Sequence, residues 1–104
     1  MEVKLVWGGW NTEGTSDKVW GIIQRCDANK TTKYNDRIYV FWGARGKSLQ
    51  FKNDVWAREL QDLTAKKERK GYKQIDYAKL LKIWPDFEDT LNQKLTFHIL
   101  VNSD

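Results

Sequence analysis

Alternation of apolar and polar residues dominates the first half of the chain. Such alternation predicts strands, because successive side chains of a strand point to opposite faces of a sheet. Polar or glycine-containing segments separate these strands, and they predict a hairpin loop at 28–36 and a tight turn at 43–47. The predicted strands cover residues 2–7, 18–27, 37–43 and 48–52.

The first and third predicted strands carry apolar side chains in informative positions. In the first strand, Val3, Leu5 and Trp7 are expected on one face. The third strand is apolar on both faces: one carries Ile38, Val40 and Trp42, and the other carries Tyr39 and Phe41. One of these faces must meet a helix. The other is either covered by later elements or is a binding surface.

The period changes to that of a helix between residues 55 and 70. Its apolar positions are Trp56, Leu60 and Leu63. Asn53 or Asp54 is the expected N-cap, and Gly71 is expected to end the helix after a basic last turn.

The remaining third predicts shorter elements. Residues 73–75 form a connector or short strand, and Asp76 can cap a short helix. The apolar stripe of that helix is Tyr77, Leu80, Leu81 and Trp84. After Pro85, Phe87 and Leu91 mark a last helix, and residues 95–101 predict a final strand. The expected fold is therefore α+β: an antiparallel β-sheet with one long helix packed on one face, short C-terminal helices and a final strand.

Composition indicates one globular domain over residues 1–104, with 40% hydrophobic and 31% charged residues. The single cysteine, Cys26, excludes an intrachain disulfide. No apolar stretch approaches the ~20 residues that a transmembrane helix needs. Since the N-terminus also lacks the form of a signal peptide, we expect a cytoplasmic protein without membrane contact.

The net charge of +4 is concentrated in the middle of the chain. Residues 44–82 hold eleven basic and five acidic side chains, whereas residues 83–104 hold one basic and four acidic. A local basic zone is typical of a protein that binds a polyanion. A solvated helix face would give the same composition.

Two segments within this zone suggest the chemistry of nucleic-acid binding. Trp42-Gly43 ends an apolar run, and Arg45 and Lys47 follow it. The cations can neutralise phosphates, and the flat indole of Trp42 can stack on a base or sugar. The basic run at 66–73 could clamp phosphates if the fold brings it near Trp42. The plainer interpretations are a core tryptophan before a turn and a favourable helix C-terminus. The candidate binding residues are Trp42, Gly43, Arg45, Lys47, Lys67, Arg69, Lys70, Tyr72 and Lys73.

Together these segments resemble the WGR domain, over about residues 18–77. That family has a strand ending in Trp-Gly-Arg-x-Gly and a later helix ending near Lys-x-x-Lys-Gly-Tyr. The positions that match are Trp42, Gly43, Gly46, Lys67, Lys70, Gly71 and Tyr72. Ala44 stands where the family has its arginine, and Arg45 follows one residue later. The resemblance implies a non-catalytic module that binds nucleic acid, DNA more than RNA, and leaves 1–17 and 78–104 as extensions.

The sequence shows no convincing pattern for a catalytic or metal site. One cysteine and one histidine, His98, cannot supply the four ligands of a structural zinc site. The acidic residues at 86–89 follow Pro85 at a helix start, where negative charge is stabilising in any case. The segment 43–48 lacks the spacer of a nucleotide-binding P-loop. We therefore expect no enzyme activity, no cofactor, no metal and no small-molecule substrate.

Two functions of different classes remain. The first is the nucleic-acid-binding module, reading structure or ends and not sequence. The alternative is a protein-interaction adaptor or inhibitor without nucleic-acid binding, for which Trp10 or Trp20 would be the anchors.

Overall fold

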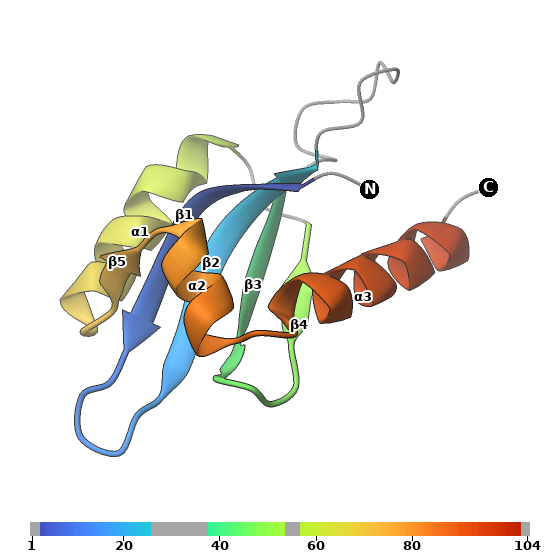
Figure 1. Cartoon of the computed structure of the whole chain (residues 1–104). Coiled ribbons are helices and arrows are strands. Elements are labelled where there is room, and N and C mark those ends of the chain that lie inside the picture. Colours follow the sequence, from blue (N-terminus) through green and yellow to red (C-terminus); the bar gives the residue numbers. More distant parts are fainter. Residues whose placement is uncertain (1–2, 26–37, 54–56, 103–104) are drawn as a thin grey trace.

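A single antiparallel sheet forms the centre of the molecule (Figure 1). The computed structural model describes residues 3–25, 38–53 and 57–102. The strands are β1 (Val3–Asn11), β2 (Lys18–Arg25), β3 (Ile38–Ala44), β4 (Gln50–Lys52) and β5 (Lys73–Ile75). Their order in the sheet is β4-β3-β2-β1-β5. The predicted α+β class is confirmed, and the segment 73–75 is a strand on the free side of β1.

Helices lie on both faces of this sheet. A short 3-10 turn (Ala57–Glu59) leads into α1 (Leu60–Arg69). The C-terminal helices are α2 (Tyr77–Ile83) and α3 (Phe87–Asn102). In Figure 1, α1 lies behind the sheet, while α2 and α3 lie in front of it.

The face toward α1 carries the smaller apolar cluster. Its buried members are Trp20, Ile22, Ile38 and Val40. Leu60 and Leu63 of α1 pack against them, as their helical spacing predicts. The predicted facing of Ile38, Val40 and Trp42 is confirmed.

The opposite face carries the main core, which α2 and α3 cover. The Phe41 and Phe87 rings lie 4.9 Å apart, and Trp84 packs on Phe87 at 5.6 Å. Leu80 and Leu91 are fully buried among them. Each such side chain contributes about 1.5–3 kcal/mol through its burial. The second apolar face of β3 is thus covered by the C-terminal elements.

The predicted final strand at 95–101 is wrong, because these residues continue α3. Phe87, Leu91 and Leu95 are spaced by four residues, so a helix places all three against the sheet, where each is buried. Phe97, which a strand would have placed on the same side as Leu95, is 69% exposed. The helical period is the one that buries the apolar side chains of this segment.

The predicted common face for Val3, Leu5 and Trp7 is also wrong. The pairing of β1 with β2 shifts between Leu5 and Trp7, so that one extra residue is accommodated in β1. Such a bulge reverses the facing of the residues after it. Val3 and Leu5 pack on the main core, whereas Trp7 packs on the α1 side against Trp20.

The start of the first helix differs from the prediction. Glu59, and not Asn53, is the N-cap of α1, and its side chain makes no capping hydrogen bond. The predicted cap at Asp76 is confirmed, since its carboxylate accepts from the Lys79 backbone N–H at 2.8 Å. The predictions for Cys26, the 28–36 loop, Asp54 and residues 55–56 lie outside the described residues. None of the helices in the described part of the chain has the length and apolar character that crossing a bilayer requires.

Candidate functional site

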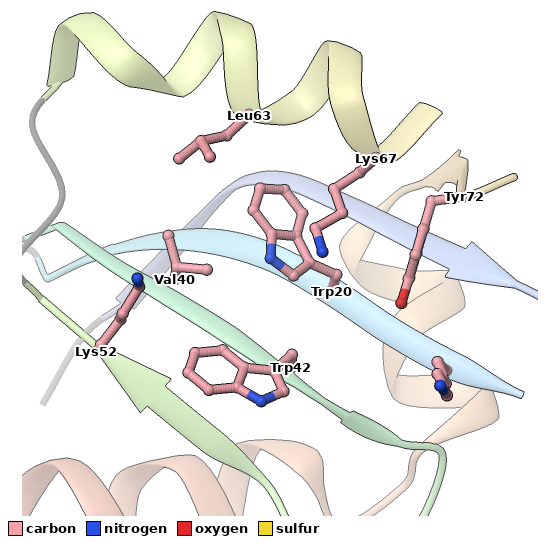
Figure 2. A pocket seen from close by; sticks show the side chains of 8 residues that line it. Trp20, Val40, Trp42, Lys52, Leu63, Lys67 and Tyr72 are labelled. Atoms are coloured by element: carbon pink, nitrogen blue, oxygen red, sulfur yellow. The ribbon is translucent and has the colours of Figure 1, made fainter. Parts of the chain in front are cut away.

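A pocket of about 430 Å³ opens on the α1 side of the sheet, where α1 leaves the strands uncovered (Figure 2). We call it the Trp42 pocket. Its lining residues are Lys18, Trp20, Val40, Trp42, Lys52, Leu63, Lys67 and Tyr72. Among the residues that the structure describes, no aspartate or glutamate contributes to the lining. The pocket therefore combines aromatic rings with three ammonium groups.

The end of α1 sets the position of one wall. Gly71 has a φ of +102°, and the Tyr72 N–H donates to the Lys67 carbonyl at 3.1 Å. Together with the bond from the Gly71 N–H to the Glu68 carbonyl, this is a Schellman cap, which glycine permits. The cap turns the chain back toward the last turn of α1. As a result, Lys67 and Tyr72 lie next to each other and form one wall of the pocket.

Lys67 lies between two aromatic rings. Its Nζ is 5.4 Å from the centre of the Trp20 ring and 5.6 Å from that of Tyr72, distances typical of cation–π contacts. Partial burial, followed by repulsion from Lys70 and Lys18, lowers the pKa of Lys67. Burial raises the pKa of the Tyr72 hydroxyl. An anion in the pocket would relieve the repulsion around Lys67.

Trp42 differs from the other described tryptophans. Trp7 and Trp20 make an edge-to-face pair, Trp84 packs on Phe87, and the Trp10 N–H donates to Asp17. Trp42 is half-buried, and within the described residues its indole has no hydrogen bond, ring contact or cation contact. Its ring packs on the apolar cluster of the α1 face, and its exposed part lines the pocket.

Strand register adds two cations that the sequence analysis missed. Trp20 pairs with Trp42, Lys18 with Ala44, and Lys52 with Val40, so the side chains of Lys18 and Lys52 project from the α1 face. Alternation within 18–22 could have placed Lys18 beside Trp20. Their approach to Trp42 required the register of β2 against β3, which the sequence does not state.

Arg45 lies away from the pocket. Its guanidinium forms a salt bridge with Asp17 at 2.8 Å and reaches the Ile83 carbonyl at the end of α2. It also lies 6.0 Å from the centre of the Trp10 ring. The bonds from Trp10 and Arg45 lower the pKa of Asp17. This cluster joins the loop before β2 and the turn after β3 to the end of α2, which gives Arg45 a structural role.

The other predicted site residues do not line the pocket. Lys73 pairs with Trp10, so its side chain projects from the α2 side of the sheet. Lys47, Arg69 and Lys70 are exposed and do not line the pocket. Gly43 is also outside the lining, and a Cβ there would lie 2.4 Å from the Ser48 carbonyl oxygen. Of the nine predicted residues, the pocket thus gathers Trp42, Lys67 and Tyr72.

Other chemistry is sparse in the described part of the chain. No group of three or more His, Cys, Asp or Glu side chains there is placed to hold a metal ion. His98 packs edge-on against Tyr39 and Phe51, at 5.9 Å and 5.4 Å between ring centres. That environment is structural.

Comparisons with protein-family models, with curated proteins and with solved structures each find no match. The resemblance to the WGR domain therefore stays a prediction from the motifs.

Proposed function

We propose that this domain is a non-catalytic nucleic-acid-binding module, with DNA as its partner. The observation that carries the proposal is the Trp42 pocket, which brings an indole without a polar or aromatic partner among the described residues together with the ammonium groups of Lys18 and Lys67. Nucleic acids present phosphate charge next to flat bases, and proteins bind them with cations and aromatic rings in one groove.

The pocket's charge decides between ligand classes. Aromatic side chains around a cavity also suit organic cations. Here three lysines line the same cavity, and the pKa of Lys67 is lowered first by burial and then by repulsion from Lys70 and Lys18. A cationic ligand would add to that repulsion, whereas an anionic ligand reduces it. An anion that also carries a flat group fits both parts of the lining.

The alternative, a protein-interaction module without nucleic-acid binding, has weaker support. Trp20 is only 4% exposed, and Trp10 is held by Asp17, so neither is placed as a free anchor. The Trp-Gly and Lys-x-x-Lys-Gly-Tyr motifs of the WGR resemblance include Trp42, Lys67 and Tyr72, and the resemblance favours DNA over RNA.

Fluorescence anisotropy across a salt series tests the proposal. Labelled single-stranded DNA, duplex DNA and RNA are titrated with the wild-type protein. If the three pocket lysines contact phosphates, the slope of log affinity against log salt is roughly −2 on a single strand. Affinity no tighter than millimolar for every probe at low salt would contradict the proposal, and a preference for RNA would contradict its DNA part.

Matched variants locate the binding. Lys67→Gln removes a pocket charge, and Lys73→Gln removes the same charge from the opposite face. We expect the first to weaken binding and reduce the salt slope by roughly 0.7 on a single strand. The second should leave both close to wild type. Equal effects of the two would place the binding elsewhere.

A further inference from the structure

The Trp42 pocket also indicates which form of nucleic acid it accepts. Its volume of about 430 Å³ lies at the small end of ligand pockets, which span roughly 300–1,000 Å³. A double helix does not enter a space of that size, whereas one nucleotide can. In a duplex, moreover, base faces are covered by stacking, and only an unpaired base offers its face to a ring.

The position of Trp42 suits such a base. In Figure 2 the indole lies over β3 with Lys52 to one side, and Val40 and Trp20 stand between it and α1. Because Trp20 is buried and in contact with Trp7 and Lys67, it acts as support. Trp42 is thus the ring available for stacking.

A polar side chain stands beside this ring. Gln50 on β4 pairs with Trp42 on β3, so both side chains project from the same face. Gln50 is exposed, and among the described residues no hydrogen bond occupies its amide. An amide both donates and accepts, as the edge of a base requires. The edge strand therefore places a hydrogen-bonding group next to the stacking surface.

Cations lie on two sides of the same surface. Lys52 is on β4 and Lys18 on β2, while Trp42 lies on β3 between these strands. A strand that crosses the sheet with one base on Trp42 would have phosphates before and after that base near the two ammonium groups. A charge on only one side would not favour this path.

We propose that the Trp42 pocket binds one unpaired nucleotide, with its base stacked on Trp42, its edge at Gln50 and its flanking phosphates near Lys18 and Lys52. This inference rests on the proposed function and specifies its substrate: single-stranded or locally unpaired nucleic acid.

The test compares probes that differ in the base alone. Three labelled DNAs are titrated by anisotropy: a blunt duplex, the same duplex with one unpaired nucleotide, and that duplex with an abasic unpaired site. We expect the unpaired nucleotide to bind more tightly than the other two. Loss of the base should weaken binding by roughly 5- to 150-fold, the range of base–aromatic stacking.

Variants of Trp42 test whether this residue causes the difference in affinity between the unpaired and abasic probes. Trp42→Leu keeps apolar packing and removes the ring, whereas Trp42→Phe keeps a smaller ring. Thermal unfolding of both variants verifies that they fold. Trp42→Leu should lose most of the preference for the unpaired nucleotide over the abasic probe, and its affinity for the abasic probe should equal that of wild type. Trp42→Phe should be intermediate. Gln50→Leu should weaken binding of the unpaired nucleotide and not of the abasic probe.

The outcomes separate the two proposals. Equal, salt-dependent affinity for all three probes would overturn the unpaired-nucleotide inference and leave the nucleic-acid module standing. Base-dependent affinity that Trp42→Leu does not change would overturn the assignment to Trp42. Absence of binding to every probe would overturn both.

Discussion

Replacing Gly71 with alanine should damage the Trp42 pocket as well as the fold. Gly71 has a φ of +102°, which side chains with a Cβ rarely adopt. The left-handed region costs such a residue about 1–2 kcal/mol. The new Cβ would also lie 2.5 Å from the carboxyl carbon of Glu13, but that side chain is exposed and can rotate away. The expected destabilisation of about 1–2 kcal/mol corresponds to a decrease in Tm of about 5–10 °C for a domain of this size.

The effect on binding follows from the cap. Gly71 permits the bond from the Tyr72 N–H to the Lys67 carbonyl, which holds the two pocket residues together. Gly71→Ala should therefore weaken DNA binding at temperatures well below its Tm. Gly46→Ala is the matched control, because Gly46 has a φ of +72° and its new Cβ would meet nothing within 4 Å. It should lower Tm comparably and leave the affinity unchanged.

Calorimetry and anisotropy on both variants measure these effects. Wild-type affinity in a destabilised Gly71→Ala protein would refute the role of the Lys67–Tyr72 wall in binding. An unchanged Tm would refute the reasoning about the cap itself.

Three further predictions concern charge and packing. Because the pKa of Lys67 is lowered, this lysine loses its proton at a lower pH than ordinary lysines do. The DNA affinity of the wild-type protein, measured by anisotropy, should therefore fall in that alkaline range. The affinity of Lys67→Gln should not fall there. Hydrogen bonds from Trp10 and Arg45 lower the pKa of Asp17. The stabilisation that Asp17 contributes is therefore complete above the ordinary aspartate pKa of about 3.9 and is lost as the pH falls through the lowered value. The Tm difference between wild type and Asp17→Asn should shrink over that acid range, and a constant difference would contradict this. Leu91→Ala in α3 should cost about 2–5 kcal/mol in chemical denaturation, whereas Phe97→Ser on the exposed side of the helix should cost less than about 0.5 kcal/mol; equal costs would contradict the packing of α3.

Local patterns predicted most of the elements. Helical spacing of apolar residues located α1, alternation predicted the two faces of β3, and Asp76 caps α2 as its residue type indicates. The errors arose where tertiary packing decides. A short apolar run such as 95–101 fits either period, and only the sheet under α3 selects the helix. The bulge in β1 depends on its pairing with β2, which no single strand reveals.

The sequence predicted those residues of the candidate site that can be recognised within a single strand or helix. Trp42 and the end of α1 were identified from their residue types, and the fold brings Trp42 and Lys67 to one pocket. Lys18 and Lys52 could not be found in this way, because their proximity to Trp42 depends on strand register. Arg45 was misplaced for a related reason. Arg45 directly follows the strand that carries Trp42, but its partner, Asp17, directly precedes the neighbouring strand β2, and strand pairing brings the two together.

The central claim, that nucleic acid binds in the Trp42 pocket, is tested most directly by the indole N–H resonances in an NMR titration with a short DNA single strand. Assignment by Trp-to-Phe variants distinguishes the tryptophans. The indole of Trp42, unpartnered among the described residues, should shift most, while Trp10, bonded to Asp17, and Trp84, buried on the opposite face, should remain in place. A titration that moves the Trp10 resonance and leaves that of Trp42 unchanged would contradict the account.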